Sequence, residues 1–139
     1  MKSIGGVTAR PFGENYQTAD WKTEKHVPVI DVPDEVKAGE MFQIQAAVGK
    51  EVPHPNTTEH HINWIELYFL PEGEKFAFEI GRFGFGAHGE SVQGANQGPV
   101  YTHHQVTAWM KTSKSGTLYA TSLCNIHGLW LSLKEIKVR

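Results

Sequence analysis

Apolar and polar residues alternate along several stretches of the chain with a period of two, which is typical of a half-buried β-strand. In residues 41–48, Gln43 and Gln45 interrupt apolar residues at the even positions. Residues 62–70 are apolar on both faces and rich in Ile, Trp, Tyr and Phe, and they end at the turn 71–75. The first pattern predicts a half-buried strand, and the second predicts a central strand of a sheet.

Further strand-like segments recur between stretches that contain Gly, Asn or Pro, and no segment has a convincing helical period. They are residues 27–32, 75–83, 103–112, 117–124 and 129–138. This spacing of short strands predicts an all-β fold, an immunoglobulin-like β-sandwich. Residues 1–20 contain Gly-rich patches and only weak periodicity, so we expect an irregular N-terminal arm followed by a single domain over residues 21–139.

Composition and charge narrow the function classes. A chain of 139 residues with a formal charge of −2 is long enough to bury a core without disulfides or a structural metal cluster. Lys and Arg do not cluster into a basic patch along the chain, so we expect no nucleic-acid partner. Residues 1–20 lack the apolar core of a signal peptide, and no apolar run approaches the roughly 18 residues of a membrane span. We therefore expect a soluble, cytoplasmic protein.

Cysteine and histidine carry the candidate chemistry. Cys124 is the only cysteine, whereas the chain has eight histidines. A single thiol cannot form an internal disulfide and is safest in a reducing compartment or as a metal ligand. His127 follows three positions later, where the chain turns at Gly128.

Three strand ends present His or Cys. His54 and His60 lie in a Pro-bearing loop before the central strand, and His26 directly precedes the strand at 27–32. Cys124 and His127 lie at the end of another strand. Because strand ends cluster in a sandwich, a convergent metal site is expected.

The other histidines are interpreted as structural or surface residues. Alternation points His61 away from His60, and His88 is expected in a turn. In the pair His103 and His104, one side chain is expected to face inward and the other outward.

The donor set restricts the metal. Structural zinc usually takes two or more cysteines, and a c-type haem needs two before the histidine. A blue-copper site uses two His, one Cys and an axial Met, but no Met follows His127. Iron is favoured, while a copper-binding, cupredoxin-like electron carrier and a metal-free adhesion module remain as alternatives.

Three motifs carry a specific resemblance: EKHVPVI (24–30), residues 49–73, and LCNIHGLW (123–130). In this order, and over most of the chain from about Trp21, they resemble the superoxide reductases, in the single-iron form also called neelaredoxin. The resemblance implies a mononuclear iron (Fe2+/Fe3+) with four equatorial imidazoles, an axial thiolate and one open position. By motif position, the ligands are His26, His54, His60, Cys124 and His127.

The resemblance also implies an activity and two further roles. The reaction is the one-electron reduction of superoxide to hydrogen peroxide, followed by re-reduction of the iron by an external donor. Glu24 matches a glutamate that occupies the sixth position in the ferric resting state, and Lys25 matches a lysine beside the open position. Backbone N–H groups after Cys124, those of Ile126 and His127, are expected to donate to the sulfur.

The implied partners are superoxide, a rubredoxin-like electron donor and further copies of the chain in a homotetramer. Lys22, Lys25 and Lys50 are candidate donor contacts by sequence proximity. The related two-iron desulfoferrodoxins bind a second iron through four cysteines, and this chain has none before residue 124. A dismutase activity remains as an alternative, and would require the ferric form to oxidise a second superoxide.

Overall fold

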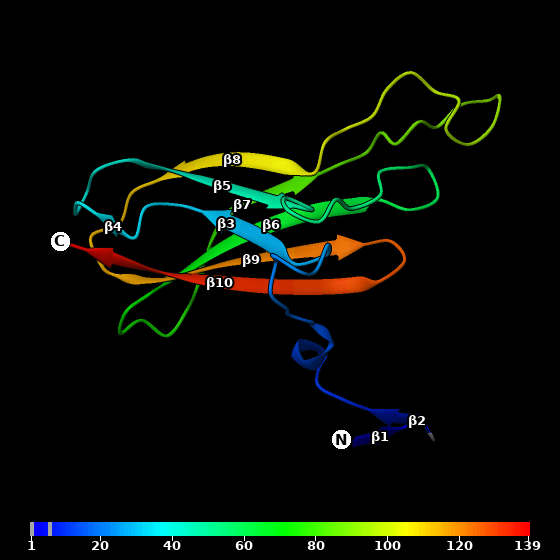
Figure 1. The fold of residues 1–139 in the computed structure, drawn as a ribbon. Coiled ribbons are helices and arrows are strands. Elements are labelled where there is room, and N and C mark those ends of the chain that lie inside the picture. The colour runs from blue at the N-terminus through cyan, green and yellow to red at the C-terminus, as the bar shows by residue number, and fades with distance from the viewer. Residues whose placement is uncertain (1, 6) are drawn as a thin grey trace.

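The computed structural model describes residues 2–5 and 7–139, and two stacked β-sheets form its body (Figure 1). The predicted β-sandwich is therefore confirmed. The five-stranded sheet has the order β4 (Glu35–Val36), β10 (Gly128–Val138), β9 (Gly116–Cys124), β6 (Ile62–Pro71) and β7 (Phe78–Gly84). The three-stranded sheet has the order β3 (Pro28–Asp31), β5 (Phe42–Val48) and β8 (Gln105–Met110).

Each strand expected from residue 27 onward is present, with shifted ends. Strand β7 begins at Phe78, although the pattern predicted a start at residue 75. Strand β4 was not predicted, because two residues are too few for a period. It pairs in parallel with the last residues of β10, whereas the other strand pairs of the two sheets are antiparallel.

The N-terminal arm contains a small two-stranded sheet, formed by β1 (Lys2–Ile4) and β2 (Val7–Ala9), and a 3₁₀ turn at Phe12–Asn15. Figure 1 shows this hairpin projecting away from the sandwich. The weak periodicity did not predict it, since three-residue strands give almost no pattern. No helical segment in the described part of the chain is long and apolar enough to cross a membrane.

Alternate residues of the central strands face one another between the sheets. On β6, Ile65 and Leu67 have no exposed surface, and on β9 the inward positions include Leu118 and Ala120. Burying a large apolar side chain stabilises the fold by about 1.5–3 kcal/mol. Cys124 is the last inward position of β9 and is 1% exposed.

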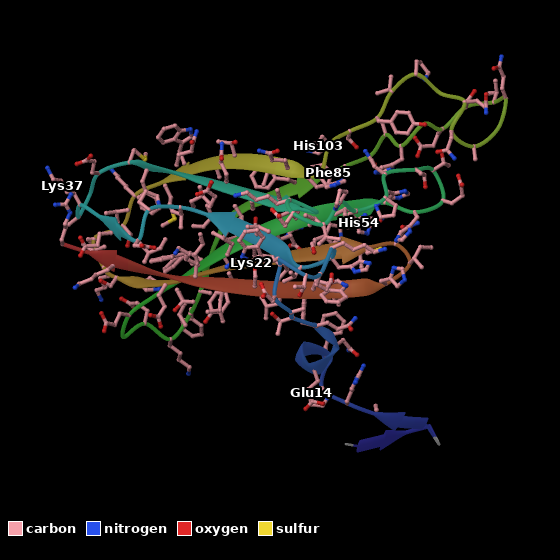
Figure 2. All side chains as sticks on the ribbon, viewed as in Figure 1. Glu14, Lys22, Lys37, His54, Phe85 and His103 are labelled. Carbon is pink, nitrogen blue, oxygen red and sulfur yellow. The ribbon has the colours of Figure 1, made fainter. Side chains whose placement is uncertain are left out.

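The loops that carry the candidate ligands meet at one end of the sandwich. Cys124, the last residue of β9, is paired with Ile62 at the start of β6 and with Gly128 at the start of β10. Figure 2 shows His54 towards this end and Lys37 at the opposite end. The sheet register therefore places the thiol next to the loop that precedes β6.

Candidate metal centre

The tight turn between β9 and β10 presents Cys124 and His127 together. The backbone N–H of His127 donates to Cys124 Sγ at 3.3 Å, and His127 Nδ1 lies 3.7 Å from the same sulfur. This bond confirms the expectation that the backbone N–H of His127 donates to the Cys124 sulfur. Gly128 closes the turn at a φ of 80°, a left-handed conformation that favours glycine.

His26 reaches the turn from the loop before β3. Its Nε2 lies 3.1 Å from His127 Nδ1. The His26 ring stacks on the Trp130 indole with centroids 4.9 Å apart and planes 12° apart. Trp130 Nε1 also donates to the His127 carbonyl at 3.2 Å. One indole therefore contacts two candidate ligands.

The Glu24 carboxylate is held by His26. It accepts hydrogen bonds from the backbone N–H of His26 and, at 3.0 Å, from the ring Nδ1. A histidine whose Nδ1–H is held by a carboxylate presents its Nε2 lone pair outward, as in many metal sites. In this structure Glu24 therefore orients His26.

His60 comes from the irregular segment 57–61. Its Nε2 lies 3.3 Å from His127 Nδ1. The Thr57 N–H donates to the His60 carbonyl at 2.9 Å, and the His60 N–H donates to Thr57 Oγ1 at 3.0 Å. Asn125 joins this segment to the Cys124 turn, because its Oδ1 accepts from the His61 N–H at 2.8 Å.

These contacts form a group that can hold a metal ion. The group is His26, His60, Cys124 and His127, with donor atoms all within 4.8 Å of one another. Metal–imidazole bonds of about 2.1 Å place neighbouring ligand nitrogens about 3 Å apart, close to the separations between His127 Nδ1 and the other two rings. Three converging nitrogen lone pairs repel one another unless a cation or proton lies between them.

His54 lies beside this group but is not one of the four residues within that limit. Its ring centroid is 5.0 Å from that of His26 and 4.8 Å from that of His60. Its Nδ1 must carry the proton, since it donates to the Pro55 carbonyl at 2.6 Å. Its Nε2 is buried and meets no hydrogen-bond partner among the described residues. A buried lone pair without a donor fits a metal ligand.

Burial holds these imidazoles in the neutral form that a metal binds. It lowers the pKa of His54 to about 4, and the pKa of both His26 and His60 is lowered by burial as well. Glu24 opposes this effect at His26, because its charge favours the imidazolium. Neutral rings keep their lone pairs available, so these imidazoles need to release few protons when a metal binds.

Comparison with known proteins identifies the family. The desulfoferrodoxin family model matches residues 18–133. The chain belongs to the desulfoferrodoxin family. Its relatives in that family include a neelaredoxin from Megalodesulfovibrio gigas, 56% identical over 124 residues, which are 89% of this chain and 95% of that protein. A superoxide reductase from Pyrococcus furiosus is 58% identical over 119 residues, 86% of this chain and 94% of that protein.

A solved structure shows the same fold at high identity. Superoxide reductase (neelaredoxin) from Archaeoglobus fulgidus, in the reduced form, matches this desulfoferrodoxin-family chain with a TM-score of 0.82 and 54% identity. The match covers 88% of this chain and 98% of that one. It confirms the sequence resemblance over nearly the whole sandwich.

The other histidines of this family member lie outside the four-residue group. His104 is buried and His103 is exposed, as the alternation predicted. His88, expected in a turn, lies in the irregular stretch between β7 and β8 and is 4% exposed. Its loop folds back at a bridge to Tyr101, and its ring stacks on His61 with centroids 3.5 Å apart, which excludes water.

Lys25 is the one of the three candidate donor-contact lysines that acts electrostatically on rings of the metal group. The Lys25 charge adds to the effect of burial in lowering the pKa of His26 and His60, so it acts on both rings. Lys22 Nζ and Lys50 Nζ each lie 5.8 Å from the centroid of the Trp21 ring. The structure therefore brings Lys22 and Lys50 to one indole.

Sequence reasoning missed three supporting residues. Asn125 and Trp130 lie inside the LCNIHGLW motif, but alternation alone could not show their contacts. Gln17 belongs to no motif. It bridges the edge of β10 at Trp130, and its Nε2 donates to the His127 carbonyl at 3.3 Å. The arm thus contacts the candidate site.

Proposed function

We propose that this chain is a superoxide reductase with one iron per chain, held by His26, His54, His60, Cys124 and His127. The observation that carries the proposal is the convergence of three imidazoles on one buried thiol. Beside them lies the buried Nε2 of His54, which has no hydrogen-bond partner in the described part of the chain. The superoxide reductase relatives support the reaction assignment. In this proposal the iron-binding domain spans residues 21–139, and residues 1–20 form the arm.

Iron bound here would supply one electron to superoxide, which takes up two protons to give hydrogen peroxide. Neutral imidazoles leave the positive charge of the metal largely uncompensated, which favours an anionic substrate. Cys124 would donate electron density as a thiolate, and the His127 N–H at its sulfur moderates that donation. His127 is exposed, so the group is open to solvent on that side.

Metal analysis combined with stopped-flow mixing of the reduced protein and superoxide tests this proposal. We expect one iron per chain, rapid oxidation of that iron, and one peroxide per superoxide without release of oxygen. Copper in place of iron would favour the cupredoxin-like alternative, and oxygen release would indicate dismutation. Either result would contradict the proposal.

Replacing Lys25 with Ala is expected to slow the reaction with superoxide about 2- to 10-fold at low salt, because a positive charge beside the site attracts the anion. Added salt should narrow the difference, since it screens that charge. Stopped-flow rates over a range of ionic strength measure both effects. Lys37→Ala is the matched control, because it removes the same charge at the opposite end of the sandwich (Figure 2). Equal rates in both variants would exclude the steering role.

Glu24 orients His26, and Glu24→Gln and Glu24→Ala test whether it has a second role. We propose that the carboxylate also closes the open position of ferric iron, since a hard anion prefers Fe(III). If so, both variants should bind azide more tightly than the unmodified protein. Gln can still accept from the backbone N–H of His26, so it retains part of the orienting contact. Unchanged azide affinity in both variants would contradict the closing role.

We also propose an electron donor of the rubredoxin type that approaches Lys22, Lys25 and Lys50. The shared position of Lys22 and Lys50 on Trp21 supports a cationic surface for a small acidic protein. Stopped-flow reduction of the oxidised protein by reduced rubredoxin tests the donor. A homotetramer and a reducing, cytoplasmic location complete the proposal. Sedimentation velocity tests the former, and cell fractionation tests the latter.

A further inference from the structure

The loop that joins β7 to β8 extends beyond the sandwich at the same end as the candidate ligands (Figure 1). Its own backbone holds it together. The Gly89 N–H donates to the Val100 carbonyl at 3.0 Å, and the Gly98 N–H donates to the Gly89 carbonyl at 2.9 Å. A Cβ at Gly98 would lie 2.2 Å from the Glu90 carbonyl oxygen, so only glycine fits there. This loop over residues 85–104, the excursion loop, therefore has a defined conformation.

Asn96 connects this loop to the segment that carries His60. Its Oδ1 accepts from the Thr58 N–H at 2.8 Å, and its own N–H donates to Thr58 Oγ1 at 3.0 Å. Its Nδ2 donates to Glu59 Oε1 at 2.6 Å. Asn96 has a φ of 62° and is the one non-glycine residue with positive φ among those the structure describes. Asparagine tolerates this conformation better than most residues.

The two residues that Asn96 holds directly precede His60. Thr58 is fixed again when its Oγ1 donates to the His88 carbonyl at 2.6 Å. On the other side of the segment, Asn125 Nδ2 donates to the Glu59 carbonyl at 2.9 Å. The chain before His60 is therefore clamped between the excursion loop and the Cys124 turn, although it belongs to no strand.

We propose that Asn96 is a positioning residue of the metal centre, acting through Thr58 and Glu59 on the direction of the His60 imidazole. This inference rests on the proposed iron site. The direction of a histidine ring follows from its backbone. Because this segment has no sheet pairing, side-chain bonds to Thr58 and Glu59 supplement the single Thr57 N–H to His60 carbonyl bond in fixing it. Outer contacts of this kind typically change metal affinity by about 10- to 100-fold.

The test compares Asn96→Gly with Val92→Ala in the iron-loaded protein. Glycine keeps the positive φ and the backbone N–H, so only the two side-chain bonds are lost. Val92 is fully exposed in the same loop and serves as the control. We expect Asn96→Gly to lose iron to a chelator about 10-fold faster, and to alter the electron paramagnetic resonance signal of its ferric iron. Val92→Ala should match the unmodified protein in both.

A lower melting temperature of the metal-free Asn96→Gly protein, with unchanged iron release and ferric signal, would show a purely structural role and overturn the inference. If Asn96→Gly does not fold, Asn96→Asp replaces it. Aspartate keeps the acceptor for the Thr58 N–H but places a carboxylate against Glu59, and the same two changes are expected. An unmodified protein without bound iron would instead overturn the proposed function itself.

Discussion

Cys124→Ser is expected to lower the rate of superoxide reduction about 100-fold or more. A serine hydroxyl stays protonated at neutral pH and cannot replace a thiolate ligand. Loss of a direct ligand should exceed the roughly 10- to 100-fold effects of outer contacts on metal affinity or activity. The sulfur-to-iron absorption of the oxidised protein should disappear with it. Metal analysis, visible spectra and stopped-flow rates measure these changes.

Ile126→Ala is the control for that variant. Ile126 lies in the same turn, and its side chain is largely exposed. Alanine keeps the backbone N–H groups of the turn, so iron content and rate should stay unchanged. A Cys124→Ser protein that retains the sulfur-to-iron band or the full rate would show that the thiol is not a ligand.

His54→Ala is expected to weaken iron binding at least about 10-fold, because it removes the buried Nε2 that otherwise has no partner in the described structure. The result decides whether the site has five protein ligands or only the four donors that already lie together. Competition with a chelator at fixed pH measures the affinity. The remaining donors should still bind some iron, so the loss is expected to be partial.

His104→Ala provides a closely matched control. His104 is 6% exposed, as His54 is, and burial likewise lowers its pKa to about 4. The two rings are 5.9 Å apart. Both variants remove a buried neutral imidazole, but only His54 is proposed to bind iron. Equal weakening in the two variants would mean that His54 acts through packing alone.

The supporting contacts divide into two kinds. Glu24 and Trp130 act on the ring of His26 directly, by a hydrogen bond and by stacking. Asn125 and Asn96 act on backbone segments that carry other candidate ligands. Glu24 variants should change the ferric spectrum more than the stability of the metal-free protein, whereas loss of the buried Trp130 indole should change both. Variants of the second kind should change both.

The sequence by itself determined the sandwich and the identity of the candidate donors. Alternation over 41–48 and the apolar run at 62–70 have the period of strands, and period depends only on neighbouring residues. Cys124 and His127 are three positions apart, so their meeting in one turn is also local. His26, His54 and His60 were found because motifs placed them at strand ends.

Only the tertiary structure decided how those donors are held. Glu24 lies on His26, Trp130 stacks under the same ring, and Asn96 reaches Thr58 across 38 positions. His88 is buried because its loop folds back, and the β1–β2 hairpin forms from strands too short to show a period. Most of these contacts join residues far apart in the chain or depend on the path of irregular loops. The alternation of apolar and polar residues does not encode that path.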